Sequence, residues 1–573
     1  KVCASAVASM LVLLPALAPA VRAPSEPAAL TAPRFGAGSS ELPNILMVLS
    51  DDHGHTDLGI TGIDSLVDTP VLDKLAANGA LFEYGYASAP QCVPSRAGLM
   101  SGRNQNTFGL YMNDADAGYG VAVLPPKSKV MTIAEHLKDA GHGYVTGMSG
   151  KWHLGGVEPN VVEHAGNRGF DEFMDGLVDQ FRTNIDPDDE SLLDTALLVR
   201  NSSNRVDVSA DFAERFVARH SKDRFFYYWA PFGPHEPMLE DGDPYLAAFP
   251  KPHYSWYSDE ENDRRHRALA MVKAIDTRLG SVLAALQQHA LEESTLILFA
   301  SDNGAPLGLD FDKEEGRYTR LAGAAEAYQG SENVPLRGAK GFLWEGGIRV
   351  PMFAYWKGTI PPGQVIREPV TTLDLTATIA RAAGLDLKVL EGQSLLPRLV
   401  GDAVTVARPT SVRALAKLPE GSHGGLQYFW TSKSGDSAVR TGDWKLRRCK
   451  SHHLELVYLF NITADPLELQ NLVEKPTRAF TVLTLMNALD DWEADLPFAV
   501  NCLQAADHGL KYVRTAAQPC SAPNVDPRFV VEHEATCFPG EMEGSDAIPE
   551  RLNKLPRSLW KIAAAELRGQ RGV

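Results

Sequence analysis

Two groups of acidic and amide residues follow apolar runs that are far apart in the sequence. Asp51 and Asp52 come directly after NILMVLS, and Asp302 and Asn303 come after TLILFAS. Carboxylate and amide oxygens are the donors that Ca²⁺ and Mg²⁺ prefer, whereas Zn²⁺ favours nitrogen and sulfur. Either pair alone is better explained as solvated turn residues. If the pairs meet in the fold, three crowded carboxylates would need a cation between them.

Basic residues occur beside the same runs. Each one alone is ordinarily a structural salt-bridge partner, but several converging on a metal would bind an anion even in an acidic protein. His235 lies between two prolines in GPHEP, a segment that cannot continue a sheet, so we do not expect a core position for it. The basic candidates are Arg96, Arg103, Lys151, His153, His235 and Lys340.

One cysteine stands apart from the other five. Cys92 lies in SAPQCVPSRAGLMSGRN, far along the chain from Cys3 in the first segment. The others, Cys449, Cys502, Cys520 and Cys537, fall in the last quarter of the sequence. Four cysteines can pair in three ways, which leaves Cys92 as either an inert core thiol or a site of chemistry.

Strand-like and helix-like segments alternate and would position these residues. The pattern predicts an α/β fold with a large, mostly parallel or mixed sheet flanked by helices. The polar candidates follow the strands, where the carboxyl ends of an open α/β sheet form a ligand crevice. The expected strands are 44–50, GYVTGMSGKWH, RFFYYWAP and STLILFASDNG, and the expected helices are 131–141, SADFAERFVARH and 263–289.

The organisation of the 573 residues suggests four parts. Residues 1–24 resemble a secretory signal, with a leading Lys, an apolar run and small residues at its end. We expect a catalytic α/β domain over 42–395 and a smaller C-terminal α+β subdomain over 396–500, with a small antiparallel sheet and a helix. Residues 501–573 form a cysteine-containing extension to which we assign no role.

Composition excludes some functions and permits others. The formal net charge of −17 argues against a general nucleic-acid-binding protein. No apolar run approaches the length of a confident transmembrane span. Together with the signal-like segment and the Asn-x-Ser/Thr sequons at Asn201 and Asn461, this predicts a protein of the secretory pathway, either secreted or in a lysosome-like compartment, or periplasmic in a bacterium.

The segment CVPSRAGLMSGR resembles the signature of the type I sulfatases, Cys-x-Pro-Ser-Arg-x-x-x-x-x-Gly-Arg. Further segments are similar to this family's motifs and occur in its order: LSDDHGHTDLG, GKWHLG, FGPHEP, SDNGA and LRGAKGFLWEGGIRVP. The resemblance spans residues 42 to 500, and implies an alkaline-phosphatase-like fold. Two departures from the family pattern, Glu391 and Phe460 in place of Asp, fall outside these motifs.

The resemblance implies a particular chemistry. Cys92 would be oxidised by a formylglycine-generating enzyme, before folding, to Cα-formylglycine, whose hydrated form attacks sulfur. A divalent cation, Ca²⁺ or less favoured Mg²⁺, would be held by Asp51, Asp52, residue 92, Asp302 and Asn303. Arg96 would hold the diol, and Lys151, His235 and Lys340 would neutralise the sulfate, with His235 or Lys340 protonating the leaving alcohol. His153 would deprotonate the second hydroxyl of the diol to expel sulfate.

The resemblance also frames the substrate and its alternatives. We expect a sulfate ester, and GNRGFDEFMDG (166–176) is more similar to carbohydrate-directed members than to simple aryl sulfatases. A phosphonate or phosphate ester hydrolase of the same superfamily would share the metal segments but act on a phosphorus ester, and a phosphate monoester carries one more negative charge than a sulfate ester. A non-catalytic protein that binds sulfated polymers would keep the anion pocket and an unmodified Cys92.

Overall fold

The computed structural model describes most of the central part of the chain. The described residues are 42–111, 113, 123–155, 164–177, 180–184, 204–255, 257–306, 309–312, 317–320, 328–401, 427–431, 436–450 and 455–496. The signal-like segment, the C-terminal extension and the sequon at Asn201 lie outside these ranges. Within them, Cys92 is a free cysteine and Cys449 is disulfide-bonded.

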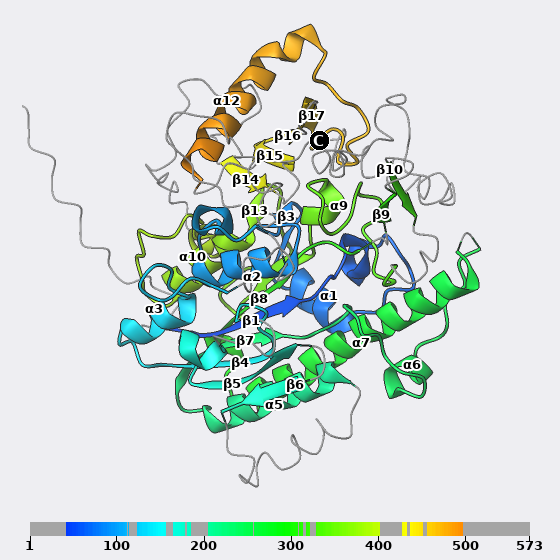
Figure 1. Ribbon diagram of the computed structural model, residues 1–573. Helices are drawn as coiled ribbons and strands as arrows, with labels where there is room; N and C mark the ends of the chain where they lie inside the picture. Colours follow the sequence, from blue (N-terminus) through cyan, green and yellow to red (C-terminus); the bar gives the residue numbers. More distant parts are fainter. Residues whose placement is uncertain are drawn as a thin grey trace, which may run out of the picture. The chain divides into compact units, whose positions relative to one another are not determined.

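A nine-stranded sheet is the largest sheet among the described residues (Figure 1). The central strands are parallel: β1 lies between β7 and β8, and Val48 of β1 is paired with both Trp229 and Phe299. The edges are mixed, because β11 runs antiparallel to β8 and β6 runs antiparallel to β5. In spatial order the strands are β12 (Gln364–Ile366), β2 (Ala80–Phe82), β11 (Met352–Tyr355), β8 (Thr295–Ser301), β1 (Asn44–Ser50), β7 (Arg224–Ala230), β4 (Tyr144–Lys151), β5 (Glu172–Leu177) and β6 (Gln180–Thr183). The prediction of a mostly parallel or mixed sheet is confirmed.

Helices cover both faces of this sheet (Figure 1). On one face, α1 (Pro70–Ala77), α5 (Arg205–Arg219) and α7 (Asp259–Gln288) bury an apolar core against β1, β7 and β8. On the other face lie α2 (Cys92–Ser101), α3 (Ile133–Asp139) and α10 (Thr372–Ala382). Because the central strands are covered on both faces, they are continuous apolar runs rather than alternating ones, as the sequence predicted.

Local sequence signals explain where the long helices begin. Ser258 and Glu261 form a capping box at the start of α7, each side chain bonded to the other residue's backbone N–H. The Asn204 side chain accepts hydrogen bonds from the backbone N–H groups of Val206 and Asp207 at the start of α5. None of the helices in the described ranges has both the length and the apolar character needed to span a membrane.

A second sheet follows in the C-terminal part of the described chain. Strands β14 (Gln427–Thr431), β15 (Asp436–Thr441), β16 (Trp444–Lys450) and β17 (Glu455–Asn461) pair antiparallel in sequence order. Helix α12 (Ala479–Asp495) packs on one face of this sheet through Leu485 and Leu489 (Figure 1). The segment SAVRTGDWKLRR forms a hairpin of two strands, because Gly442 at φ 53° begins a two-residue turn. The predicted antiparallel sheet and helix are confirmed; the domain boundaries stay predictions.

Short elements complete the described structure. The helices are α6 (Pro244–Ala248), α9 (Glu345–Ile348) and α11 (Leu396–Leu399), and the strands are β3 (Gly85–Tyr86), β13 (Val370–Thr371), β9 (Leu309–Asp312) and β10 (Arg317–Arg320). Single 3-10 turns occupy His55–Asp57, Gly59–Thr61, Gln105–Phe108, Ala165–Arg168, Glu292–Ser294 and Pro476–Arg478. The segment around α9 packs against the second sheet, so residues near the main sheet's carboxyl edge contact both sheets.

Candidate active site

Two adjacent aspartates end the central strand β1. Asp51 and Asp52 are both 0% exposed, so neither is a solvated turn residue. Asp52 has a left-handed backbone (φ 58°), which a non-glycine residue rarely adopts outside functional or strained positions. Its backbone N–H donates to Oδ1 of Asp302 (3.1 Å), which follows β8. The two acidic pairs, 250 residues apart in sequence, therefore meet at one edge of the sheet.

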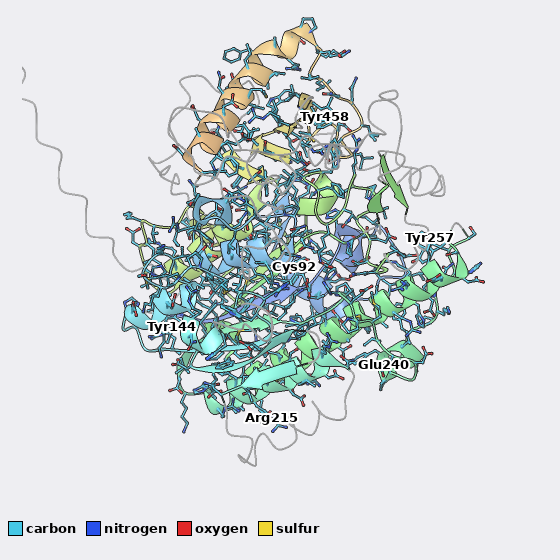
Figure 2. The ribbon with its side chains drawn as sticks, viewed as in Figure 1. Cys92, Tyr144, Arg215, Glu240, Tyr257 and Tyr458 are labelled. Atoms are coloured by element: carbon cyan, nitrogen blue, oxygen red, sulfur yellow. The ribbon has the colours of Figure 1, made fainter. Side chains whose placement is uncertain are left out.

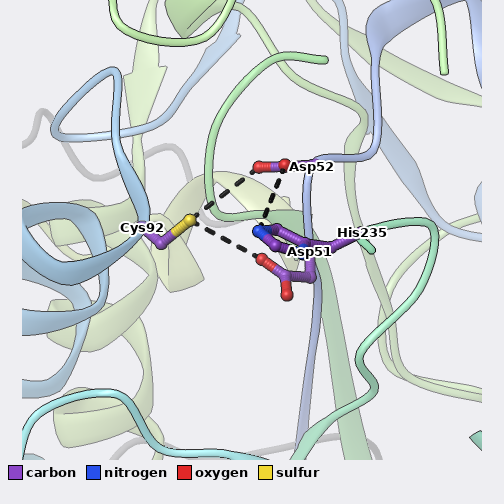
Figure 3. Close-up of side chains that lie close together, drawn as sticks. All are labelled: Asp51, Asp52, Cys92 and His235. Carbon is purple, nitrogen blue, oxygen red and sulfur yellow. Dashed lines mark hydrogen bonds and ion pairs between the residues drawn. The ribbon is translucent and has the colours of Figure 1, made fainter. Parts of the chain in front are cut away.

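Cys92 faces these aspartates from the start of α2 (Figure 3). Its Sγ lies 3.7 Å from Asp51 Oδ1 and 3.8 Å from Asp52 Oδ1. The side chain is 0% exposed and lies deep among the packed side chains (Figure 2). Burial raises the pKa of the Cys92 thiol to about 12, even though Lys151 and Lys340 lower it. A thiol with this pKa is protonated at neutral pH and is a poor nucleophile.

Arg96 lies one helical turn after Cys92 and joins three parts of the site. Its Nη2 is 2.7 Å from Asp302 Oδ2 and 3.2 Å from Asp51 Oδ1. Its Nη1 donates to the backbone carbonyl of Lys151 (2.9 Å). Burial alone would lower the pKa of Arg96, but Asp302 and other anionic groups hold it well above its ordinary value. Arg96 therefore stays cationic and fixes α2 against β4 and β8.

Two lysines complete the ion pairs of the aspartates. Lys151, the last residue of β4, places Nζ 2.7 and 2.9 Å from the two carboxylate oxygens of Asp51. Lys340 places Nζ 2.8 Å from Asp52 Oδ2. Burial lowers the pKa of Lys340, but the nearby carboxylates, Asp52 first among them, raise it by more, so that the net shift is upward. Both ammonium groups are therefore available to an anion that reaches the cluster.

Two histidines lie at the same edge. His235, after β7, has Nε2 3.7 Å from Asp52 Oδ2 (Figure 3), and its Nδ1 donates to the Glu236 carbonyl oxygen (2.7 Å). Burial, followed by Lys151, lowers the pKa of His235. His153 has Nδ1 buried without a hydrogen-bond partner, and burial together with Lys151 holds its pKa well below the ordinary value. Both rings therefore favour the neutral form, which can accept a proton.

Arg103, the remaining basic candidate, is not part of this cluster. It lies two residues after the end of α2, with Nε 4.0 Å from Glu391 Oε1 and its guanidinium carbon 5.9 Å from the ring centroid of Phe108. The sequence grouped it with the other cations because all of them occur after or beside the same predicted strands. Its position at the far end of the helix gives it a different set of neighbours.

The donor atoms at this edge suit a hard divalent cation. The Asn303 amide nitrogen donates to Asp52 Oδ1 (2.6 Å), whereas its Oδ1 is buried with no hydrogen-bond partner. An unsatisfied buried oxygen beside crowded carboxylates is a suitable cation ligand. Asp51, Asp52, Cys92 and His235 each offer one ligand atom, and these atoms lie within 4.8 Å of one another. Burial raises the pKa of Asp302 to about 6, although Arg96 lowers it.

His235 is the residue whose position differs most from the expected division of roles. The sequence placed it among the cations around the substrate, and in the structure its ring also offers one of the four atoms that could hold a metal ion. Asp302, expected as a ligand, has one oxygen beside Arg96 and accepts a hydrogen bond on the other. The spacing of motifs along the chain does not indicate how the His235 ring approaches the Asp52 carboxylate.

Comparison with known families identifies the class of protein. The family model described as Sulfatase matches residues 43–385, and the model described as N-sulphoglucosamine sulphohydrolase, C-terminal, matches residues 339–495. The chain therefore belongs to the sulfatase family, and its reaction is the hydrolysis of sulfate esters.

Individual relatives agree with this assignment. The chain is 30% identical over 467 residues to N-acetylgalactosamine-6-sulfatase from Canis lupus familiaris, covering 75% of this chain and 82% of that protein. It is 30% identical over 539 residues to arylsulfatase A from Homo sapiens, covering 86% of this chain and 95% of that protein. Among solved structures, Ps i-CgsB in complex with k-i-k-neocarrahexaose has a TM-score of 0.61 and 26% identity, over 82% of this chain and 97% of that one.

Proposed function

We propose that this sulfatase acts through a Cα-formylglycine at position 92 and a bound Ca²⁺, and that its substrate is a sulfated carbohydrate. The observation that carries the proposal is the environment of Cys92. Its buried thiol has a pKa of about 12 and points at two metal-suited carboxylates, 3.7 and 3.8 Å away. A protonated thiol has no use there as a nucleophile, whereas a hydrated aldehyde would supply a hydroxyl that attacks sulfur and a second hydroxyl through which sulfate leaves.

The cation would be held by oxygens of Asp51, Asp52, Asp302 and Asn303 together with residue 92. It would neutralise charge on the sulfate oxygens and lower the pKa of a bound hydroxyl. Ca²⁺ fits a site with several carboxylate and amide donors on different strands, because it accepts irregular geometry more readily than Mg²⁺. The buried, unpartnered Oδ1 of Asn303 supports this ligand set.

The remaining residues divide the work of binding and proton transfer. Lys151 and Lys340 would bind the non-bridging sulfate oxygens, since both ammonium groups already lie beside the carboxylates. Lys340, or His235 once it has taken up a proton, would protonate the leaving alcohol. His153, whose ring favours the neutral form, would accept the proton of the second hydroxyl. Arg96 would orient residue 92 through its contacts with Asp51 and Asp302.

The substrate class and the compartment rest on other observations. One relative is named N-acetylgalactosamine-6-sulfatase, after an amino sugar, and the Ps i-CgsB structure is a complex with the oligosaccharide k-i-k-neocarrahexaose. The segment 166–176 in this chain is similar to carbohydrate-directed members. The signal-like residues 1–24 and the disulfide-bonded Cys449 support a compartment of the secretory pathway, where a formylglycine-generating enzyme would act on the unfolded chain.

Peptide mass spectrometry on protein from a secretory host tests the aldehyde. The peptide is LAANGALFEYGYASAPQCVPSR, residues 75 to 96. We expect a mass that corresponds to loss of sulfur and two hydrogens and gain of one oxygen at Cys92. An intact, alkylatable thiol in protein that releases no sulfate would instead support a binding protein for sulfated polymers.

A substrate panel then separates the ester classes. We expect sulfate release from sulfated mono- and oligosaccharides and from 4-nitrophenyl sulfate, with no release from the Cys92→Ala variant. Faster turnover of 4-nitrophenyl phosphate or a phosphonate monoester would overturn the sulfate assignment. Activity restricted to aryl sulfates would overturn the carbohydrate assignment alone.

A further inference from the structure

Lys340 lies at the tip of a loop that touches the active site. Its Nζ pairs with Asp52 (2.8 Å), its backbone N–H donates to the Ala305 carbonyl (3.1 Å), and the N–H of Gly341 donates to the Pro90 carbonyl (2.8 Å). Pro90 lies two residues before Cys92. The loop tip is therefore bonded to segments that flank the cysteine and the metal-suited residues.

The loop closes on itself just behind Lys340. The backbone N–H of Gly346 donates to the Arg337 carbonyl (2.6 Å), and an added Cβ at Gly346 would lie 2.4 Å from the carbonyl oxygen of Gly338. Gly338 and Gly341, on either side of Lys340, have φ angles of 84° and 90°. Because glycines restrict the backbone little, contacts outside the loop must fix where its tip lies.

The base of the loop is fixed by the second sheet through Trp344. The guanidinium of Arg447, on β16, lies 3.9 Å from the centroid of the indole ring, and that of Arg337 lies 3.7 Å from it. Phe460 of β17 packs edge-on against the same ring, with centroids 5.8 Å apart. Trp344 and Arg447 are both fully buried, so the attraction of this desolvated cation to the ring is stronger than on a surface.

The next residue, Glu345, is fixed by a buried ion cluster. Lys445 of β16 places Nζ 2.9 Å from Glu345 Oε1 and 2.9 Å from Glu468 Oε1. The backbone N–H of Glu345 donates to Glu468 Oε2 (2.7 Å), and Tyr86 donates its hydroxyl proton to Glu345 Oε2 (2.8 Å). Lys445, Glu345 and Glu468 have side chains that are 0% exposed. Buried ions tolerate little displacement, because a charge that loses its partner there is costly.

Strand β16 therefore has two faces with different neighbours. Lys445 and Arg447 face the loop that carries Lys340, whereas Trp444 and Leu446 belong to the core shared with α12. Arg448, on that second face, pairs with Glu493 of α12 (2.7 Å). Because successive side chains of a strand point to opposite faces, Arg447 contacts the loop and the adjacent Arg448 does not.

We propose that Lys445 and Arg447 are positioning residues that hold Lys340 in place for sulfate binding. The inference rests on the proposed role of Lys340 in the sulfatase reaction. The path runs from β16 to Trp344 and Glu345, through the closed loop to Lys340, and from there to Asp52. The C-terminal sheet is thus a functional part of the active site although neither β16 residue reaches the substrate.

Two double variants test this proposal, each of which removes one buried cation and one buried carboxylate so that the net charge of the region does not change. One is Lys445→Met with Glu468→Gln, and the other is Arg447→Met with Asp436→Asn, because Asp436 pairs with Arg447 (2.9 Å). The matched control is Arg448→Met, which removes a buried cation from the opposite face of the same strand. Each protein is assayed with 4-nitrophenyl sulfate well below its unfolding temperature, and KM, kcat and the inhibition constant of inorganic sulfate are measured.

We expect both double variants to lower kcat/KM by about tenfold or more and to raise KM and the sulfate inhibition constant, because small displacements of a positioned group have large effects. Arg448→Met should keep both constants at the wild-type values. A merely structural role would reduce the amount of active enzyme and leave KM and the inhibition constant of the remaining molecules unchanged, and that result in either folded double variant overturns the proposal. Wild-type enzyme that releases no sulfate would instead refute the proposed function itself.

Discussion

Lys151 and Lys340, which are far apart in the sequence, form ion pairs with the adjacent residues Asp51 and Asp52. Lys151 Nζ lies 2.7 Å from Asp51 Oδ2, and Lys340 Nζ lies 2.8 Å from Asp52 Oδ2. One lysine ends a strand of the main sheet, and the other lies on a loop fixed by the C-terminal sheet. The two ammonium groups therefore flank the cysteine with independent structural support.

Removing either lysine should impair the reaction while preserving the fold. We expect Lys151→Met and Lys340→Met to lower kcat/KM for 4-nitrophenyl sulfate by about 10²–10³-fold, since each removes a charge aimed at the sulfate. Lys357→Met is the control, because Lys357 is half-exposed and pairs with Glu292 (3.1 Å). Wild-type kinetics in the Lys340 variant would remove that residue from the mechanism.

Loss of the unpartnered oxygen of Asn303 should weaken metal binding. We expect Asn303→Ala to retain less Ca²⁺ after dialysis, as measured by elemental analysis. Saturating Ca²⁺ stabilises a protein by about 2.7 kcal/mol at a hundredfold excess over Kd, so the variant should also show a smaller rise in Tm on Ca²⁺ addition. Asp276→Asn is a control for a buried carboxylate outside the site, because Asp276 accepts backbone hydrogen bonds at the start of α1. Equal metal content in the two variants would contradict the ligand assignment.

Gly150 should not tolerate a side chain. It has φ 104°, and an added Cβ would lie 2.0 Å from the carbonyl oxygen of Ala230 on the neighbouring strand β7. Gly358 also has positive φ, 74°, but nothing lies within 4 Å of its added Cβ. We expect Gly358→Ala to lower the free energy of unfolding by about 1–2 kcal/mol through backbone strain alone. Gly150→Ala should lower the free energy of unfolding, measured with urea, by more than this, and should also lower activity by moving Lys151. An equal loss of stability in the two variants would contradict the predicted clash.

His220 should make stability depend on pH. Its two ring nitrogens lie 2.8 Å from Glu172 and 2.9 Å from Asp223, and the hydrogen bond to Glu172 is the main cause that raises the pKa of His220 above its ordinary 6.5. Because the folded-state pKa is the higher one, this contribution is complete below pH 6.5 and is lost as pH rises through the folded-state value.

The corresponding measurement compares His220→Gln with wild type. At acidic pH the variant should have a free energy of unfolding lower than that of wild type by about 0.5–1 kcal/mol, a small difference because the ion pairs are partly exposed. At alkaline pH, where His220 is neutral, the two proteins should have similar stability. His142→Gln provides the control, since Nδ1 of His142 faces the Ala383 carbonyl oxygen (2.9 Å) and no carboxylate. A difference between His220→Gln and wild type that does not change with pH would contradict this account.

The sequence allowed the sheet and the position of the site to be predicted together. Apolar runs such as 44–50 are buried on both faces, which identifies central strands, and parallel strands bring the residues after them to one edge. Asp51 and Asp302 meet for this reason alone. The edge strands escaped prediction because β2 has three residues and β12 has three, too few for a periodic pattern.

The contacts between side chains could not be predicted in the same way. Arg96 and Asp302 are 206 residues apart, and nothing in either motif indicates that they pair. The alternation in β16 is visible in the sequence, but which face meets Trp344 depends on how the two sheets pack. Lys445 and Arg447 therefore resemble ordinary strand cations until the structure shows their partners.

The complete burial of Cys92 means that any enzyme that modifies this side chain must act before the chain has folded. No part of its side chain is exposed in the folded structure, so a modifying enzyme has access only while the chain is still unfolded. If residue 92 must become an aldehyde, folding and conversion compete for the same polypeptide, and a molecule that folds first is trapped as an inactive protein of native appearance. The specific activity of a preparation would then report the ratio of two rates, and slower folding in the cell would yield a more active enzyme from the same gene.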